Sequence, residues 1–457
     1  MKKINTVKGI CEAIWEIEQT HDLLNMRIEE VKIWQYIRMD MYYKIATSIG
    51  VLNEPHPIKT SFKNKIISLI MMIVNYIIRN PLTGKYSKDI LIFDHPRKIL
   101  SMGEYIDPYT DYYIKSLDAG SYLVYERPYM GKHLKNNKEN IKYLDTLILA
   151  SQIHRFFNKV KFSEEELSRI DSIQSDISRT FNIDLNLKSF ISNRILKFNY
   201  ENSYYEKLLK KRKPKEIYLV ISYNNAPLIN AAKTLGIPVT EFQHGIISKY
   251  HLGYSYPFRE VQQLEYLPDK MFGFSNYWFN KSFIPLDSSQ IFIRGYDHFR
   301  IQKNKYKKVK KDPAIILFIS QGVIGKELFQ IAVDLSVIQP EMKVIYKLHP
   351  SEYTTWKDSY LQSKELPENL SVVANNNTDL YELMAKASFQ IGVFSTAIYE
   401  GLEFGCNTIL VNLPGIEYMQ DLIDDGIVNF ANNIDDINSA INTNRKNIMK
   451  NTEGSFF

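Results

Sequence analysis

The sequence predicts an α/β protein with two parallel-sheet domains that follow a helical N-terminal extension. The chain has 457 residues, about three times the usual length of one domain. From about residue 88, short apolar runs alternate with longer helical stretches, which is typical of parallel sheets covered on both faces. A lysine-rich stretch divides these runs into two series, so two such domains are expected.

The composition is that of a folded globular protein, since 45% hydrophobic and 24% charged residues exclude a disordered, collagenous or disulfide-stapled chain. The net charge of +6 is spread along the chain, so no nucleic acid partner is expected. Cys11 and Cys406 lie far apart in the sequence and predict neither a disulfide framework nor a thiolate metal site. Because the N-terminal residues show no apolar signal core, a cytoplasmic location is expected.

Residues 1–85 are expected to form a helical N-terminal extension. Apolar and aromatic residues recur there at helical spacing, as in Ile28, Val31, Trp34, Ile37 and Met41.

Within this extension, residues 66–78 read IISLIMMIVNYII, with Lys63, Lys65 and Arg79 at the flanks. The run falls short of the roughly 20 residues that a membrane-spanning helix needs. Two interpretations stay open: a helix packed into an accessory core, or a helix that lies on the anionic inner leaflet. The second would make the protein peripheral at the inner membrane.

Two α/β series follow the extension. The first, residues 86–303, contains the expected strands DILIFDHP (89–96), SYLVYERP (121–128), EIYLVISYNN (216–225), PVTEFQHG (238–245), DKMFGFS (269–275) and QIFIRG (290–295). Residues 304–313, NKYKKVKKDP, are expected to be a linker. The second series, residues 314–457, contains AIILFIS (314–320), KVIYKLHP (343–350), LSVVAN (370–375), FQIGVFS (389–395) and NTILVNLP (407–414). Two such series predict two Rossmann-like domains that face each other across a cleft.

Ligands of open parallel sheets bind beyond the carboxyl ends of the strands, so the residues that end each run are the candidates. In the second series, Ser320, Gln321 and Gly322 form a small turn before a helix, where backbone N–H groups could hold a phosphate. A plain strand-to-helix turn is the structural alternative. The next run ends in Lys347 and His349, which fall on one side of the strand and suit a phosphate whose charge builds up during a reaction. A histidine that caps the strand end is the alternative there.

A third strand end carries Ser395 and Thr396, whose hydroxyls could cap the next helix or bind phosphate at its N-terminus. On that helix, Glu400 and Glu403 are three residues apart and are expected to share one face, where a carboxylate could accept hydrogen bonds from a ribose. A solvated acidic helix face is the alternative. Gly401 lies between them and suggests a close approach to the backbone.

In the first series, His244 ends a strand in EFQHG and is expected to face the cleft as a base or as a group that stabilises charge. Glu104, Asp107 and Asp111 follow the first strand of that series in GEYIDPYTDYY. A carboxylate near an acceptor hydroxyl could also serve as the base, and the sequence leaves open which one.

Several motifs are absent from the sequence. It contains no phosphate-binding GKS/T loop, no GxGxxG after a strand, no HExxH and no histidine or cysteine cluster with metal spacing. Neither a metal ion nor a cofactor is therefore expected.

The segments EFQHGIIS, LPDKMFGFSNYW, IFIRGYDHF, ISQG, YKLHP and GVFSTAIYEGLEFG resemble bacterial surface-polysaccharide transferases of the GT-B fold, over roughly residues 88–420. The groups concerned are capsule Kdo transferases, bacterial sialyl- and polysialyltransferases and the CDP-glycerol glycerophosphotransferases of teichoic acid synthesis. The resemblance implies an N-terminal acceptor domain and a C-terminal nucleotide-donor domain, and it places the donor phosphates on His349, Ser395 and Thr396.

The expected function is therefore metal-independent transfer of a sugar, with inversion, from a nucleotide-activated donor to a capsule, lipopolysaccharide or related glycan. A CMP-sugar is the favoured donor, and the acceptor could be lipid-linked. Three alternatives stay open: a CDP-polyol phosphotransferase of teichoic-type polymers, a non-hydrolysing nucleotide-sugar 2-epimerase, and a non-catalytic polysaccharide-assembly protein.

Overall fold

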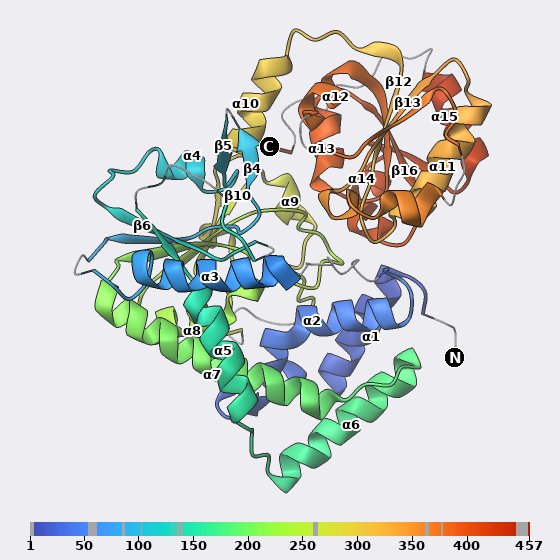
Figure 1. The fold of residues 1–457 in the computed structure, drawn as a ribbon. Coiled ribbons are helices and arrows are strands. Elements are labelled where there is room, and N and C mark those ends of the chain that lie inside the picture. The colour runs from blue at the N-terminus through green and yellow to red at the C-terminus, as the bar shows by residue number, and fades with distance from the viewer. Residues whose placement is uncertain are drawn as a thin grey trace.

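The computed structural model contains two parallel-sheet domains, with a helical layer below them (Figure 1). It describes residues 4–53, 62–84, 87–101, 103–129, 131–134, 138, 140–258, 264–361, 365–375, 378–444 and 456–457.

The described part of the N-terminal domain contains a seven-stranded parallel sheet in the order β11-β10-β9-β8-β3-β6-β7. The chain forms β3 in the middle of the sheet and then adds β6 and β7 toward one edge. It returns to the middle with β8 and adds β9, β10 and β11 toward the other edge. The reversal between β3 and β8 creates the crevice where ligands bind in such sheets. The strands are β3 (Ile90–Phe93), β6 (Tyr122–Glu126), β7 (Ile141–Tyr143), β8 (Glu216–Val220), β9 (Val239–Phe242), β10 (Lys270–Gly273) and β11 (Ile291–Ile293).

Helices and an antiparallel hairpin surround this sheet. They include the helix of residues 62–78, which lies within the predicted extension 1–85 but packs against α5. The longest helix, α7, packs against both α5 and α8. The elements are α3 (Phe62–Ile78), β4 (Ile99–Ser101), β5 (Glu104–Ile106), α4 (Asp111–Ile114), α5 (Asp145–Phe157), α6 (Glu164–Phe181), α7 (Leu187–Arg212), α8 (Ala226–Thr234) and α9 (Tyr277–Asn280).

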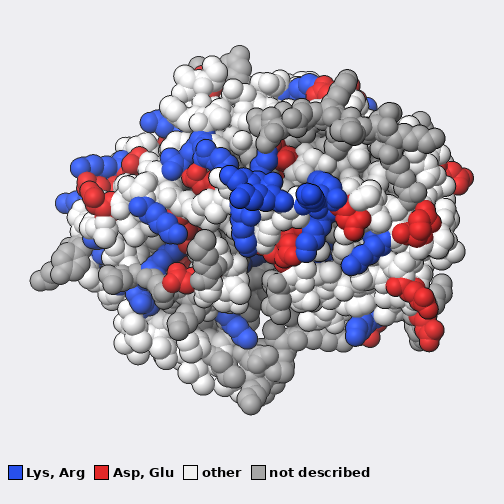
Figure 2. All heavy atoms as spheres, turned by 90° about the horizontal axis from the view of Figure 1, so that it is seen from above, with Lys and Arg blue, Asp and Glu red and all other residues white. Residues whose placement is uncertain are grey.

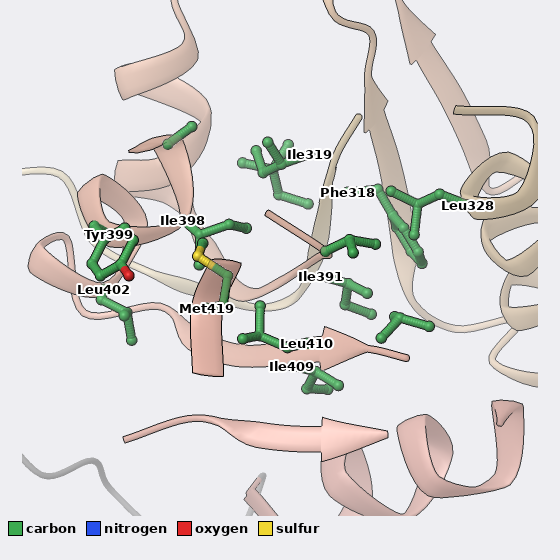
Figure 3. Close-up of a cluster of buried hydrophobic side chains, with 14 of the residues drawn as sticks. Phe318, Ile319, Leu328, Ile391, Ile398, Tyr399, Leu402, Ile409, Leu410 and Met419 are labelled. Carbon is green, nitrogen blue, oxygen red and sulfur yellow. The ribbon is translucent and has the colours of Figure 1, made fainter. Parts of the chain in front are cut away.

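The C-terminal domain repeats the same wiring in a six-stranded parallel sheet of order β14-β13-β12-β15-β16-β17, which reverses between β12 and β15. Its apolar side chains meet those of the flanking helices in one buried cluster (Figure 3). The elements are β12 (Asp312–Ile319), α11 (Gly325–Ile338), β13 (Lys343–Lys347), β14 (Leu370–Val373), α12 (Leu380–Lys386), β15 (Ala387–Gly392), α13 (Thr396–Glu403), β16 (Asn407–Val411), α14 (Gln420–Asp424), β17 (Asn429–Ala431) and α15 (Ile434–Asn444).

These two sheets confirm the predicted fold class, and each predicted strand run contains a strand of the structure. The prediction did not include the short strands β7 and β17 or the β4–β5 hairpin.

The N-terminal extension contains α1 (Val7–Thr20) and α2 (Ile33–Ser48), but its fully helical prediction is wrong between them. Ile28 and Val31 pair across an antiparallel hairpin of β1 (Arg27–Ile28) and β2 (Val31–Lys32). The two residues between these strands, Glu29 and Glu30, have φ values of 46° and 65°, which form a tight turn and interrupt the helical pattern.

The extension is bound tightly to both domains. The buried Arg38 pairs with Glu18 at 2.6 Å, and its Nη1 donates to the carbonyl of Ser255 in the loop after β9 at 2.7 Å. The hydroxyls of Tyr42 and Tyr418 hydrogen-bond at 2.6 Å, which joins α2 to the C-terminal domain.

Two segments connect the sheets. Helix α10 (Asp297–Tyr306) leads into β12, so the predicted linker, residues 304–313, begins in the last turn of a helix and ends in a strand. This stretch exposes Lys305, Lys307, Lys308 and Lys310. Seen from above, that side of the molecule shows Lys and Arg gathered near its centre (Figure 2). The second connection is Phe456, whose carbonyl accepts a hydrogen bond from the indole N–H of Trp278 at 2.7 Å.

Candidate active site

The carboxyl ends of the two sheets face each other where the N-terminal and C-terminal domains meet, and this boundary is here called the cleft. Arg97, after β3, places Nη1 3.5 Å from Nε2 of His349, after β13. A Cβ built on Gly245, after β9, would lie 4.0 Å from Cγ2 of Thr396, at the start of α13. Residues of both domains therefore meet where the fold places ligands.

The turn after β13 holds His349 in a fixed orientation. Glu352 accepts a hydrogen bond from the backbone N–H of His349 at 2.5 Å and from the hydroxyl of Ser320 at 2.8 Å. Nδ1 of His349 lies 2.7 Å from the hydroxyl oxygen of Ser351 and donates to it, which leaves the lone pair of the neutral ring on Nε2. Burial, with Arg97 nearby, lowers the pKa of His349 to about 4, which keeps the ring neutral at physiological pH.

Arg97 and His349 converge on one point from opposite domains. Nη1 of Arg97 donates to Nε2 of His349 at 3.5 Å, so the histidine holds the guanidinium in place. The other N–H groups of the guanidinium can donate to an anionic oxygen. Arg97 is exposed, so a ligand in the cleft can reach it.

Lys347 is buried in the wall of this site, on the side of β14. Its ammonium group donates to the hydroxyl of Tyr353 at 2.6 Å and to the carbonyl of Asn375 at 2.7 Å. Burial lowers the pKa of Lys347 to about 8. Lys347 therefore lies near His349, and its ammonium group donates to groups of the protein itself.

The turn after β12 contributes shape more than side-chain chemistry. Ser320 is buried. Its hydroxyl donates to Glu352 and accepts a hydrogen bond from the hydroxyl of Tyr346 at 3.0 Å. A Cβ on Gly322 would lie 2.5 Å from the hydroxyl of Ser351, so glycine lets this turn pack against the His349 turn. Gln321, between Ser320 and Gly322 in the sequence, is half-buried.

The start of α13 provides a second candidate for phosphate binding. Ser395 caps the helix by accepting a hydrogen bond from the backbone N–H of Ala397 at 3.2 Å, and Thr396 begins the helix at the cleft. Strands β13 and β15 flank β12 on either side, so Ser395 and His349 follow strands at the same edge of the sheet with β12 between them. Gly401 was expected to allow a close approach to its backbone. The group that approaches it is the buried side-chain amide of Gln390, whose Oε1 would overlap a Cβ at this position.

Glu400 and Glu403 are both buried on α13 but have different partners. Glu400 accepts a hydrogen bond from the hydroxyl of Tyr381 at 3.0 Å, and burial raises its pKa to about 7. Glu403 accepts from Lys303 at 2.9 Å and from the backbone N–H of Phe456 at 2.9 Å, so it ties α13 to α10 and to the end of the chain. Only Glu400 remains a candidate for ligand binding.

His244 is oriented by a buried pair that the prediction did not include. The hydroxyl of Tyr254 donates to Glu241 at 2.5 Å and lies 3.3 Å from Nδ1 of His244. Because that hydroxyl proton goes to Glu241, Nδ1 of His244 must donate, and Nε2 then carries the lone pair. Burial lowers the pKa of His244 well below its usual range, so the ring is a neutral base at physiological pH. The quoted motif EFQHG contained Glu241, but nothing in the sequence indicated the partner at Tyr254.

Two of the three candidate carboxylates after β3 are engaged by groups of the protein itself. Asp107 is fully buried and accepts from the backbone N–H groups of His95 at 2.8 Å and Tyr109 at 3.0 Å. Asp111 pairs with Lys138 at 2.5 Å and accepts from the backbone N–H of Asp107 at 3.0 Å. Glu104 is exposed on the β4–β5 hairpin. Asp107 and Asp111 therefore hold the loop that presents His95.

His95 lies beside His244, with ring centroids 6.3 Å apart and planes within 19°. Its Nδ1 donates to the carbonyl of Arg97 at 3.1 Å, which leaves the lone pair on Nε2. The sequence motif DHPR contains both His95 and Arg97, but only the fold brings them to the cleft.

A cavity of about 240 Å³ lies at the reversal point of the N-terminal sheet, bordered by α2 and α7. The hydroxyl of Tyr36, a buried residue that lines it, meets no hydrogen-bond partner in the part of the chain that the structure describes. Ile221 in its wall has a φ of 68°, a left-handed conformation that β-branched residues rarely adopt. The cavity is lined by Tyr36, Met39, Asp40, Phe93, Asp94, Pro96, Tyr125, Arg127, Leu144, Arg194, Lys197, Val220, Ile221, Tyr223, Asn224 and Asn225.

Among the described residues, no group of three or more His, Cys, Asp or Glu side chains has a geometry that could hold a metal ion.

The order and direction of the strands define a two-domain protein of the GT-B type. No protein-family model and no curated protein matches the chain. Among solved structures, the chain is similar to UDP-GlcNAc 2-epimerase from Rickettsia bellii (TM-score 0.47, 12% identity, 81% of this chain and 91% of that chain covered). It is also similar to UDP-GlcNAc 2-epimerase from Neisseria meningitidis bound to UDP-GlcNAc (0.44, 12%, 79% and 94%) and to the glycotransferase of kitacinnamycin (0.45, 12%, 80% and 92%).

Proposed function

We propose that this protein is a metal-independent glycosyltransferase. It moves a sugar, with inversion, from a nucleotide-activated donor, with a CMP-sugar favoured, to a hydroxyl of a capsule, lipopolysaccharide or related surface glycan. The observation that supports this proposal most is the contact of Arg97 with His349 from opposite domains, because an exposed guanidinium held there suits a departing phosphate oxygen.

The donor would lie against the carboxyl ends of β13, β12 and β15. Its phosphate accepts hydrogen bonds from Arg97, which His349 positions, and the N-terminus of α13 at Ser395 adds a favourable dipole. Glu400, buried beside Tyr381, accepts hydrogen bonds from the ribose hydroxyls.

In the transfer step, the acceptor hydroxyl gives its proton to Nε2 of His244 while its oxygen bonds to the anomeric carbon. The bond between that carbon and the phosphate oxygen breaks, and its electron pair leaves with the nucleotide. Arg97, which His349 positions, stabilises the charge that develops there. Glu241, through Tyr254, stabilises the imidazolium that forms on His244.

The cavity at the reversal point of the N-terminal sheet would hold the acceptor sugar. Its lining mixes cations such as Arg194 with the carboxylates Asp40 and Asp94. Hydroxyl groups both donate and accept, so a polyhydroxylated ring fits this mixture better than an anion does. The cavity lies next to the proposed base, because Tyr223 in its wall has its ring centroid 6.3 Å from that of His244.

The first test is a thermal-shift screen of CMP, CDP, UDP, GDP and their sugars. A bound nucleotide at a hundred times its dissociation constant stabilises the protein by about 2.7 kcal/mol. Arg97→Ala and His349→Ala should each lose this stabilisation, whereas Arg300→Ala, which removes an exposed arginine paired with Asp297, should keep it. Stabilisation that survives in both cleft variants would refute the phosphate site.

The second test is product analysis with the selected nucleotide sugar and a glycan acceptor. A new glycosidic bond supports the proposal. Isomerisation of the nucleotide sugar without acceptor would make the protein a 2-epimerase, and a phosphodiester product would make it a polyol phosphotransferase. If no nucleotide binds, the assembly-protein alternative replaces the enzyme.

A further inference from the structure

Helix α3 (Phe62–Ile78) has its polar and apolar sides reversed relative to an ordinary surface helix. Its buried Asn75 faces the domain, where the side-chain amide donates to Asp145 at 3.4 Å. Ser68 faces the domain too and donates to the carbonyl of Gly131 at 2.9 Å. Nine large apolar side chains of this helix are instead 36% to 71% exposed, Ile70, Ile73 and Ile77 among them. A surface helix normally buries its apolar stripe and exposes its polar one.

This arrangement overturns one of the two interpretations left open by the sequence. A helix packed into an accessory core would bury its isoleucine and methionine side chains, and α3 exposes most of those described. The other interpretation, an interfacial helix, requires such an exposed face.

Helix α5 extends the apolar surface. It packs against α3, and both helices lie toward the viewer in Figure 1, in front of α7. Near its end, Ile153, Phe156 and Phe157 are 51%, 83% and 76% exposed. Exposed phenylalanines at this level are costly in water, since each side chain gains free energy by leaving it. Two helices from separate parts of the sequence thus form one surface, here called the α3–α5 face.

The chain segments that form the α3–α5 face carry few acidic residues. The sequence has no Asp or Glu between Glu54 and Asp89, and none between Asp145 and Glu164. Lys159 and Lys161 are exposed just beyond α5 and form the basic rim of the face, before Glu164 and Glu165, which are exposed at the start of α6. An apolar face with a basic rim complements anionic lipid headgroups over an acyl layer.

We propose that the α3–α5 face lies on the surface of an anionic bilayer. None of the described helices is long and apolar enough to cross a membrane, and the 17 residues of α3 span about 25 Å, so the helix lies along the surface. A second copy of the chain is a poorer occupant, because its face would carry the same basic rim and repel this one. This proposal does not depend on the proposed enzymatic function.

The test is co-sedimentation of the full chain with vesicles of phosphatidylethanolamine and phosphatidylglycerol, with phosphatidylcholine vesicles for comparison. The wild type should bind the anionic vesicles, and binding should weaken as salt is raised. Ile70→Ser/Ile73→Ser/Ile77→Ser should lower the partition coefficient by at least a hundredfold, because three apolar side chains no longer enter the acyl layer.

Two further variants separate the contributions of the face. Phe156→Ser/Phe157→Ser should weaken binding by at least tenfold if α5 takes part. The matched control is Val337→Ser/Ile338→Ser on α11, which removes two exposed apolar side chains (67% and 44%) elsewhere and should bind like the wild type.

Three outcomes would overturn the proposal. The first is a wild type that ignores anionic vesicles at low salt. The second is equal, salt-insensitive binding to anionic and neutral vesicles. The third is a wild-type dimer in sedimentation velocity that the triple variant makes monomeric without vesicle binding in either, because the face would then be a self-association surface. Unchanged thermal unfolding of the triple variant checks that the fold is intact.

Discussion

Tyr254→Phe tests whether the buried pair behind His244 acts in catalysis. The substitution keeps the ring, which stacks on His251 at 5.2 Å, and removes only the hydroxyl that links Glu241 to His244. A hydrogen bond to a charged group contributes about 1.5–3 kcal/mol, so the free energy of unfolding should fall by about 2 kcal/mol. Without this link, Nδ1 of His244 loses its acceptor and the ring is no longer fixed with its lone pair toward the cleft.

We expect kcat to fall about 10- to 100-fold, which corresponds to about 1.4–2.7 kcal/mol of lost transition-state stabilisation. The donor KM and the stabilisation by bound nucleotide should stay within twofold, because Tyr254 lies away from the phosphate site. Tyr250→Phe, on the same loop but stacked on Trp15 at 6.2 Å, is the control and should keep its turnover. Wild-type kcat in Tyr254→Phe would refute the positioning role, and a parallel loss of kcat and nucleotide binding would indicate a purely structural one.

The remaining expectations concern the donor site. Ser395→Ala and Thr396→Ala should raise the donor KM about 3- to 30-fold with kcat nearly unchanged, and steady-state kinetics that instead show a raised acceptor KM would mean that the two domain roles are reversed. The pKa of Glu400 is about 7, so its carboxylate takes up a proton as the pH falls through 7 and the donor KM should rise below that pH. Glu400→Gln should have a raised donor KM that no longer depends on pH between 6 and 8, and a variant with the wild-type profile would exclude this residue from ribose binding. Activity should survive EDTA, because Arg97, positioned by His349, provides the positive charge for the leaving phosphate. Loss of activity that Mg²⁺ or Mn²⁺ restores would contradict this.

The sequence predicted the sheets well because parallel strands buried on both faces read as continuous apolar runs, as in ILIF at Ile90–Phe93. It did not predict β7, whose three residues, Ile141–Tyr143, lie at the sheet edge with a lysine in the middle. A strand this short and polar resembles a loop. The hairpin at Arg27–Lys32 was missed because its apolar residues also fit a helical spacing.

The candidate site was predictable where it depends on strand ends and unpredictable where it depends on contacts between distant segments. His349, Ser395 and His244 follow strands directly, so their position at the cleft could be inferred from local sequence. Arg97 also follows a strand, but its role depends on reaching His349 across the domain boundary, 252 residues later. Likewise, the spacing of Glu400 and Glu403 could not indicate that Lys303 and the backbone N–H of Phe456 donate hydrogen bonds to Glu403.

Ile221 sets a limit on how this protein can be engineered. Its left-handed backbone costs on the order of 1–3 kcal/mol, and a residue in such a conformation persists only where the surrounding structure holds it. Glycine at this position would relieve the strain and raise the melting temperature, but it would also remove a wall of the cavity and loosen the turn that carries Tyr223. Thermostabilisation by consensus or Gly substitution at this position is therefore in conflict with the proposed acceptor binding, and a stabilised variant for crystallography or biocatalysis should keep the isoleucine.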